Sequence, residues 1–316
     1  MLKAISLQKL QLSAGLFVLL TALQLTAFSQ SPQREVAVTF DDLPATRGDL
    51  AKLEYITRNL LPKLKAENVP AIGFVNEQKL FAFGQTDRPT ALLRQWLDDG
   101  HDLGNHTFSH VSIDQVPFEK YAEEVIRGET VTRTLLEARG ARLKYFRHPH
   151  LRTGPNEEYR DKLAHLLADR AYTVAPVTID NNDFVFSLAY TYAKEKHDQT
   201  LQTQIADAYV AYMEQIFEHF EKLSRDFLGR EVKQTLLLHA NEINADHFDR
   251  LAQALRTRGY RFITLDEALK DPAYSLPEAQ STRGLSWIHR WMLAKGLPMR
   301  EEPLEPAWIR ESARLR

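Results

Sequence analysis

The sequence predicts an α/β fold in which strands and helices alternate and the strands run parallel. Apolar runs rich in β-branched and aliphatic residues, such as 36–40 and 235–238, predict buried strands. Stretches with apolar residues at intervals of three and four, such as 49–65 and 201–227, predict amphipathic helices. Because consecutive strands joined through helices run in the same direction, we expect a parallel sheet or barrel.

The composition excludes several classes of function. The 316-residue chain has room for one large domain with an extension. Its formal net charge is −2, so it lacks the basic character typical of a protein that binds nucleic acid. The chain has no cysteine, which excludes disulfides, thiol catalysis and cysteine-ligated metals. Any metal ion must therefore bind to histidine, aspartate or glutamate.

Residues 1–29 have the features of a secretory signal peptide. Two lysines precede an apolar run at about 14–25, and the small residues Ala27 and Ser29 stand where cleavage before Gln30 requires them. The run is short for a transmembrane helix, and an uncleaved anchor is the alternative. We expect an exported protein, periplasmic or secreted, with no stable membrane insertion after the signal is removed.

The first predicted strand ends on two carboxylates. Val36, Val38 and Phe40 form a pattern typical of a buried strand, and Asp41 and Asp42 follow directly. Burying an unpaired carboxylate is very costly, so the pair is expected at the C-terminal end of the strand, where α/β folds place their chemistry. Because neighbouring strand residues point to opposite sides, the two carboxylates can take different roles. The alternative is an Asp-capped turn into the next helix.

The later elements follow from the same two patterns. Further strands are predicted at 69–75, 100–105, 144–147, 172–177, 235–238 and 260–264. Further helices are predicted at 90–98, 118–139, 156–169, 201–227, 246–258, 265–269 and 285–294. Prolines become frequent after residue 271. We therefore interpret 30–271 as one domain and 272–316 as a Pro-rich, partly helical extension packed on it.

Two histidines after the third predicted strand suggest a metal site. His106 and His110 are four residues apart, which on a helical turn places both imidazoles on one face. Two neutral imidazoles and one carboxylate from the Asp41-Asp42 pair can hold a divalent ion and leave positions open for water and substrate. Such a histidine pair alone is a weak signal, and most pairs of this spacing are surface or capping residues.

Polar residues follow three other predicted strands. Arg147-His148-Pro149-His150 follows one strand, Asp180-Asn181-Asn182-Asp183-Phe184 follows another, and His239 ends a third. An aspartate near His239 would fix its tautomer and keep it positively charged. Taken singly, His239 fits a satisfied core histidine and Arg147 fits a surface ion pair.

Together these stretches resemble a known family. Thr39-Phe40-Asp41-Asp42, His106-x-x-x-His110, Arg147-x-Pro149, Asp180-x-x-Asp183 and Leu238-His239 occur in the order of five motifs of the polysaccharide deacetylases, carbohydrate esterase family four. The resemblance covers about residues 35–270. It implies the NodB-homology fold, a distorted (β/α) barrel of about seven parallel strands. It also implies one divalent metal ion, usually Zn²⁺, with Co²⁺, Ni²⁺ or Mn²⁺ as alternatives.

The resemblance assigns a metal site and a base. Asp42, His106 and His110 are implied as the metal ligands. Asp41 is implied as the general base that takes a proton from water, and Arg147 as the residue that pairs with it. A carboxylate in this role fits the general chemistry of amide hydrolysis.

The resemblance also assigns an acid and a groove. His239 is implied as the general acid that protonates the leaving amine, and Asp183 as the residue that orients it. The backbone N–H of His150 is implied at the oxyanion, and Pro149, His150 and Phe184 are implied at the substrate. The family usually has other residues at His150 and Phe184, and Gly-Pro in place of Leu43-Pro44. These departures leave the substrate open.

The predicted function is an exported metal-dependent hydrolase that removes acetyl groups from N-acetylated sugars of a glycan, such as peptidoglycan or a chitin-like polymer. An O-acetyl esterase acting on a xylan-like polysaccharide is one alternative, and a catalytically inactive glycan-binding module is another. A competent acid favours the amide, because an amine leaves poorly unless it is protonated. The helix at 201–227, or its connections, is hypothesised to cover part of the groove; otherwise it is a lengthened outer helix. The oligomeric state is left open.

Overall fold

The computed structural model describes residues 34–314. The predicted signal peptide lies outside the described residues, so that prediction is untested. Within the described range, no helix is both long and apolar enough to cross a membrane.

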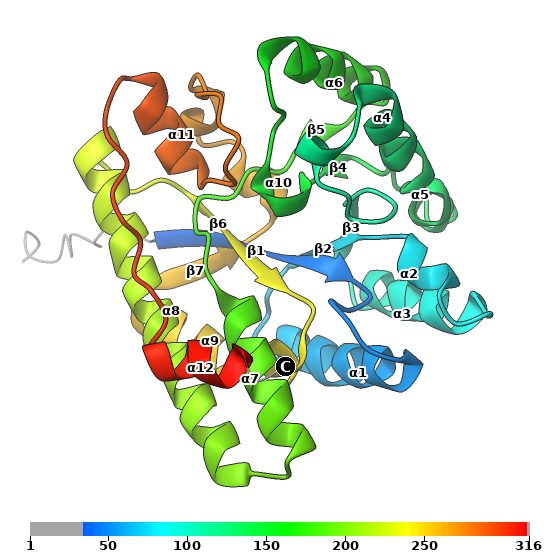
Figure 1. Cartoon of the computed structure of the whole chain (residues 1–316), viewed down its shortest axis with the longest axis vertical. Coiled ribbons are helices and arrows are strands. Elements are labelled where there is room, and N and C mark those ends of the chain that lie inside the picture. The colour runs from blue at the N-terminus through cyan, green and yellow to red at the C-terminus, as the bar shows by residue number, and fades with distance from the viewer. Residues whose placement is uncertain (1–33, 315–316) are drawn as a thin grey trace, which may run out of the picture. The chain divides into compact units, whose positions relative to one another are not determined.

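Strands and helices alternate through the described chain, as predicted (Figure 1). The strands are β1 (Arg34–Leu43), β2 (Ile72–Val75), β3 (Asp102–Asn105), β4 (Tyr145–Phe146), β5 (Thr173–Val174), β6 (Gln234–His239) and β7 (Tyr260–Ile263). The helices are α1 (Leu50–Ala66), α2 (Gln78–Phe81), α3 (Asp87–Asp98), α4 (Phe118–Arg127), α5 (Thr130–Glu137), α6 (Glu157–Asp169), α7 (Asp183–Glu195), α8 (Gln199–Leu228), α9 (Glu242–Thr257), α10 (Leu265–Ala268), α11 (Trp287–Ala294) and α12 (Ala307–Arg314).

The seven strands form one parallel sheet that curls into a distorted barrel. The order is β5-β4-β3-β2-β1-β6, and β7 pairs with the first half of β1. The chain after β5 returns to the other end of the sheet, where Ile179 forms a parallel bridge with Leu236 of β6. Because β5 pairs with β4 and its continuation pairs with β6, the two ends of the sheet meet. The predicted fold class is confirmed.

A β-bulge in β1 changes the predicted placement of the two carboxylates. The strand continues to Leu43, and between Phe40 and Leu43 it carries one more residue than the facing segment of β2, Gly73 to Val75. Asp42 has a φ of 73°, in the left-handed region. Regular alternation would send Asp41 and Asp42 to opposite sides, but a bulge re-aims side chains. Both carboxylates therefore turn toward the same site, and the prediction of opposite sides is wrong.

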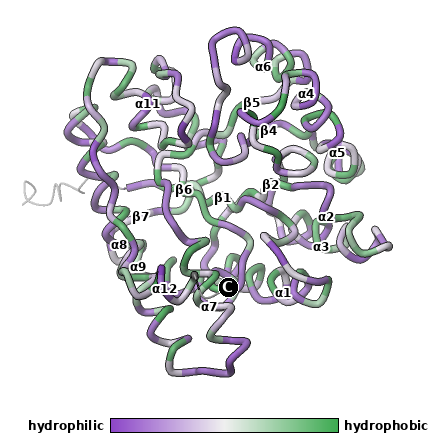
Figure 2. Tube along the Cα trace, in the orientation of Figure 1, coloured by the Kyte–Doolittle hydropathy of each residue, from purple (hydrophilic) through white to green (hydrophobic). Residues whose placement is uncertain are grey.

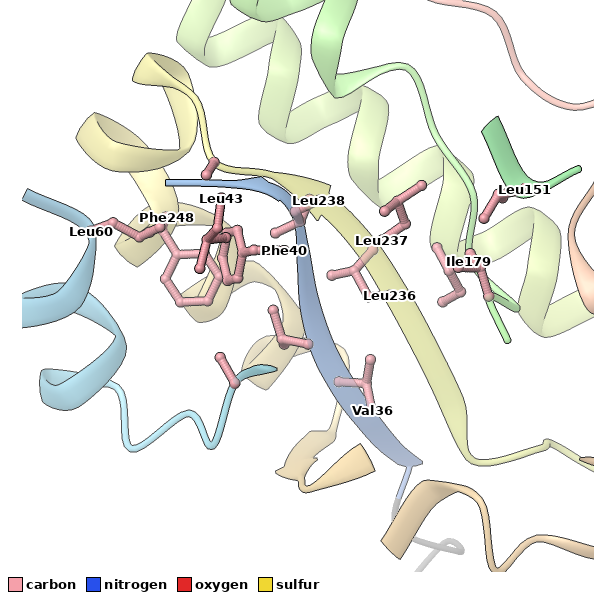
Figure 3. Close-up of a cluster of buried hydrophobic side chains, with 14 of the residues drawn as sticks. Val36, Phe40, Leu43, Leu60, Leu151, Ile179, Leu236, Leu237, Leu238 and Phe248 are labelled. Carbon is pink, nitrogen blue, oxygen red and sulfur yellow. The ribbon is translucent and has the colours of Figure 1, made fainter. Parts of the chain in front are cut away.

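The core on one side of β1 is aromatic and aliphatic. The ring centroid of Phe40 lies 5.6 Å from that of Trp96 and 5.8 Å from that of Phe248. Figure 3 shows Phe40 and Phe248 gathered with Leu43 and Leu60 between β1 and the neighbouring helices. Hydrophobic and hydrophilic residues alternate along α1 and α8 (Figure 2), which is the amphipathic pattern that predicted these helices.

One helical prediction needs correction, and three helices were missed. The single helix predicted at 118–139 is divided into α4 and α5 at Gly128, where the backbone of Thr107 comes so close that a Cβ would lie 2.5 Å from its carbonyl carbon. The missed helices are α2, α7 and α12. The α7 segment is rich in aromatic and β-branched residues of weak helix propensity, and its packing against α8, α9 and α12 decides its structure.

Candidate active site

Asp42, His106 and His110 come together as predicted and form what we call the ligand cluster. One possible ligand atom from each residue lies within 4.8 Å of the others. The Nε2 atom of His110 is 3.6 Å from Oδ1 of Asp42. Asp42 comes from the β1 bulge, and the histidines come from the loop after β3. Parallel strands bring these two chain segments to the same edge of the sheet.

The histidines of the ligand cluster are held in the form that binds metals. The Nδ1 atom of His106 is 2.9 Å from the carbonyl oxygen of Arg147, so Nδ1 carries the proton and Nε2 keeps its lone pair. Burial lowers the pKa of His106 to about 3, and burial together with the His106 ring lowers the pKa of His110 to about 3. Both imidazoles are therefore neutral at neutral pH.

The loop that carries these histidines is not the helical turn that was predicted. Thr107 and His110 have φ values of 65° and 60°. The side chain of Asn105 accepts from the Thr107 N–H at 2.7 Å, and the Glu124 carboxylate accepts from the Ser109 N–H at 2.7 Å. These polar contacts bring the two histidine rings to a centroid distance of 4.8 Å.

Lys79 is a site residue that the sequence analysis missed. Its Nζ atom donates to the Asp42 carbonyl oxygen at 2.9 Å and lies 3.3 Å from Oδ1 of the same residue. Burial raises the pKa of Asp42, but Lys79 and His110 lower it more, to well below its usual range. Asp42 is therefore ionised. The position of Lys79 just past the end of β2 was the available signal.

Asp41 and Arg147, the base-side pair, are buried and loosely paired. The Nη1 atom of Arg147 is 3.5 Å from Oδ1 of Asp41, and Nη2 donates to Thr39 Oγ1 at 2.9 Å. Burial raises the pKa of Asp41 to about 6, although Arg147 opposes the shift. Asp41 Oδ1 and Arg147 Nη1 are buried without a hydrogen-bond partner among the described residues. A buried carboxylate oxygen beside two imidazoles and a second carboxylate fits a divalent cation and its water, with Zn²⁺ suited to this donor set.

His239 and Asp183, the acid-side pair, are closely coupled. The Nδ1 atom of His239 is 2.6 Å from Oδ1 of Asp183, which is fully buried. Burial lowers the pKa of His239, but Asp183 raises it more, to about 9. The imidazole is therefore protonated at neutral pH, as expected from a neighbouring aspartate.

Two asparagines that support this pair were also missed. Asn241 and Asn244 each donate from Nδ2 to Oδ2 of Asp183, at 3.0 and 2.8 Å. The Asn241 side chain also caps α9 by accepting from the Asn244 N–H at 3.0 Å. Their position directly after the β6 strand end, spaced as a helix cap, was a signal for them.

One pocket of about 480 Å³ lies over the site. Its wall includes Asp42, His110, His150, Asp180, Phe184, His239 and Gly284. His150 is exposed, and its ring centroid is 4.5 Å from that of His110. Phe184 is 42% exposed at the rim, with its ring 6.2 Å from the His239 ring. Pro149 is buried and does not line this pocket.

Helix α8 itself does not line the pocket, so the groove hypothesis is wrong for the helix and stays a prediction for its connections. Tyr209 and Tyr212 are buried, and the Tyr212 hydroxyl accepts from the Asn182 N–H at 3.0 Å. Phe184 of α7 and Gly284 of the C-terminal extension stand at the wall instead. Both tyrosine rings are buried in the core, so they do not reach the groove.

This fold and site define a parallel α/β barrel protein with a candidate metal centre at the C-terminal ends of its strands. Residues 29–174 match the family model described as polysaccharide deacetylase. This match confirms the resemblance to the polysaccharide deacetylases that the five motifs carry.

Curated relatives include deacetylases of two glycans. A peptidoglycan-N-acetylglucosamine deacetylase of Bacillus cereus is 32% identical over 116 residues, which is 37% of this chain and 36% of that protein. A chitin deacetylase of Colletotrichum lindemuthianum is 24% identical over 239 residues, which is 75% of this chain and 79% of that protein. Among solved structures, peptidoglycan deacetylase PdaC from Bacillus subtilis matches with a TM-score of 0.47 at 20% identity, over 76% of this chain and 93% of that one.

Proposed function

We propose that this chain is an exported, metal-dependent deacetylase that removes acetyl groups from the N-acetylated sugars of a glycan. The observation that carries the proposal is that the ligand cluster lies beside both pairs: Nε2 of His106 is 3.6 Å from Oδ2 of Asp41, and His239 lines the same pocket as Asp42 and His110. The three residues of the ligand cluster would hold one divalent ion, with Zn²⁺ preferred. When bound, such an ion supplies Lewis-acid stabilisation and lowers the pKa of water.

Asp41 is suited to the role of general base. With a pKa of about 6 it is mostly ionised at neutral pH, yet more basic than an ordinary aspartate. Arg147 approaches Oδ1 from one side and limits the carboxylate's freedom to rotate. Asp41 would therefore accept a proton from the attacking water and keep that water near the reacting carbon.

His239 is suited to the role of general acid. An amine leaves an amide poorly unless it is protonated, and the imidazolium held by Asp183 has a proton to give. Because Asp183 binds Nδ1, the opposite ring nitrogen, Nε2, is the one available to the substrate. This arrangement favours amide over ester cleavage.

The pocket wall supports a sugar as the substrate. Phe184 is exposed at the rim and offers an aromatic surface to the C–H face of a sugar ring. The His150 backbone N–H is proposed to stabilise the oxyanion beside the ligand cluster. The peptidoglycan and chitin deacetylases among the relatives suggest these two polymers as the first substrates to test. Export is proposed from residues 1–29 alone.

Acetate release across a panel of substrates tests the proposal. The panel contains peptidoglycan, chitooligosaccharides, acetylated xylan and a small N-acetyl amide, each with and without a chelator. We expect release from the N-acetylated glycans, and we expect the chelator to abolish it. Release from acetylated xylan alone would identify an O-acetyl esterase. Glycan binding without acetate release from any substrate would identify an inactive binding module.

A further inference from the structure

Arg290 is a buried charge that the proposed chemistry does not use. It lies in α11, outside the five motifs, and is fully buried. Its hydrogen bonds go to uncharged oxygens: the carbonyls of Leu151, Ala279 and Arg283 at 2.7, 3.3 and 3.3 Å, and Thr153 Oγ1 at 3.2 Å. Burying a guanidinium is costly unless its donors are satisfied. These bonds satisfy Nη1 and Nη2, while Nε has no hydrogen-bond partner among the described residues. The rigid fork of arginine is suited to joining two chain segments in this way.

One of those segments carries two strained residues. His150 and Leu151 are consecutive non-glycine residues with φ values of 55° and 53°. Non-glycine residues keep left-handed conformations when several surrounding contacts hold them in place. Arg290 supplies two such contacts, because it donates to the Leu151 carbonyl and to Thr153 Oγ1. The turn it holds places the His150 ring 4.5 Å from the ring of His110, a member of the ligand cluster.

Gly284 makes a second contact with the same turn. A Cβ at residue 284 would lie 2.0 Å from the carbonyl oxygen of His150, so only glycine allows this approach. We call residues 279–290 the C-terminal strap. The strap is hydrogen-bonded to the segment after β5 that pairs with β6. Ser286 Oγ donates to the Thr178 carbonyl at 2.7 Å, and the Trp287 N–H donates to the Val177 carbonyl at 2.7 Å.

The extension also contacts the loop that leads to the acid-side pair. Glu305 is 6% exposed, and its Oε2 atom accepts from Asn182 Nδ2 at 2.8 Å. Asn182 directly precedes Asp183. Two loops of the site therefore contact residues that lie beyond 271, outside the five motifs.

We propose that the C-terminal strap is a positioning element of the active site, in which Gly284 and Arg290 hold the His150–Leu151 turn against the ligand cluster. This inference rests on the proposed function. Neither residue is expected to touch the reacting atoms, so both are positioning residues. Displacing the turn is expected to move the His150 N–H away from the oxyanion, which weakens an interaction made in the transition state.

The test compares Gly284→Ala, Arg290→Gln and Arg290→Lys with the wild type and with Arg258→Gln. Arg258 is a matched control, because it is a partly buried arginine that donates to Glu221 at 2.9 Å outside the pocket wall. Each protein is measured for metal content, thermal stability, kcat and KM on a chitooligosaccharide, and hydrogen exchange of peptides covering residues 148–153.

We expect Gly284→Ala and Arg290→Gln to lower kcat by roughly tenfold to a hundredfold, the scale of a misplacement of about 1 Å in an active site. KM should change by less than about threefold, because the affected contact is made mainly in the transition state. Exchange at 148–153 should become faster, and metal content should stay unchanged. Arg290→Lys should recover part of kcat. Arg258→Gln should lower thermal stability without affecting kcat or that exchange.

Wild-type kcat and wild-type exchange at 148–153 in both Gly284→Ala and Arg290→Gln would overturn the inference, whatever their thermal stability. If the wild type releases no acetate from any substrate, the proposed function fails, and the exchange measurement still decides the positioning role. Faster exchange at 148–153 in Gly284→Ala than in the Arg258→Gln control would then support it, and equal exchange would refute it. Gly284→Ala keeps the test valid even if the Arg290 variants do not fold.

Discussion

The base-side pair and the acid-side pair are both buried, but they differ in how many hydrogen bonds the rest of the chain makes to them. Asp183 contacts His239 at 2.6 Å and accepts three further hydrogen bonds, from the His239 N–H, Asn241 and Asn244. Asp41 lies 3.5 Å from Arg147, and atoms of both residues are buried without a hydrogen-bond partner among the described residues.

The difference lies in how many hydrogen bonds hold each pair. Asp183 orients His239 through Nδ1, and the His239 N–H, Asn241 and Asn244 hold the Asp183 carboxylate in place. In the base-side pair, Asp41 Oδ1 and Arg147 Nη1 keep hydrogen-bonding capacity. The other carboxylate oxygen of Asp41, Oδ2, lies 3.6 Å from His106 Nε2, where a cation, water and substrate are proposed to bind. Hydrogen bonds in such a water-excluded site are worth more than in water, because the local dielectric is low.

The largest effect is expected from removing a member of the ligand cluster, which lies beside the base-side pair. His110→Ala should lose the metal ion and lower kcat by about a thousandfold or more, since a metal supplies several kcal/mol of stabilisation. Metal content by elemental analysis and acetate release check both outcomes. Full metal occupancy in His110→Ala would contradict the assignment of the ligand cluster.

Removing the proton-transfer groups should have the next largest effect. Asp41→Asn and His239→Ala should each lower kcat by roughly 100-fold to 10,000-fold, the scale of general acid–base catalysis. Both variants should keep the metal ion, because neither residue belongs to the ligand cluster. Near wild-type turnover of Asp41→Asn would exclude Asp41 as the general base. The base-side pair would then have no role in proton transfer to compare with that of the acid-side pair.

The two pairs should also set the two limbs of the pH profile. Activity should fall below a pH of about 6, where Asp41 becomes protonated, and above a pH of about 9, where His239 loses its proton. Asp183 raises the pKa of His239, so Asp183→Asn should move the upper limb toward the ordinary histidine pKa of about 6.5. The kcat/KM profile of both proteins checks this. An upper limb that stays in place in Asp183→Asn would show that His239 does not produce it.

The smallest effect is expected at the outer edge of the acid-side network. The Tyr209 hydroxyl donates to Oδ1 of Asn244 at 2.6 Å, and Asn244 in turn donates to the His239 carbonyl at 2.9 Å. Tyr209→Phe should lower the free energy of unfolding by about 1 kcal/mol, the net value of one hydrogen bond, with little change in kcat. Asn244→Ala should cost more, because it leaves Asp183 with one donor fewer. Denaturant unfolding of both variants measures the difference, and equal stabilities would contradict it.

The sequence alone determined most of the composition of the site, although it did not reveal Lys79, Asn241 or Asn244. Residue types at the ends of predicted strands indicated the fold class and the candidate side chains, and the resemblance to the deacetylases assigned their roles in the ligand cluster and the two pairs. This succeeded because a parallel sheet brings the C-terminal ends of its strands to one edge. Spacing along the chain is then enough to say which side chains can meet.

Only the tertiary structure decided how those residues are aimed. The sequence analysis expected a helical turn at His106–His110, but Glu124, 15 residues away, holds that loop in another conformation. It expected Asp41 and Asp42 to point apart, but a bulge against β2 turns both inward. It left the C-terminal strap unassigned, because the Arg290 contact with Leu151 joins residues 139 positions apart. Local patterns encode which backbone conformations are favourable, whereas contacts between distant segments select the strained ones on which this site depends.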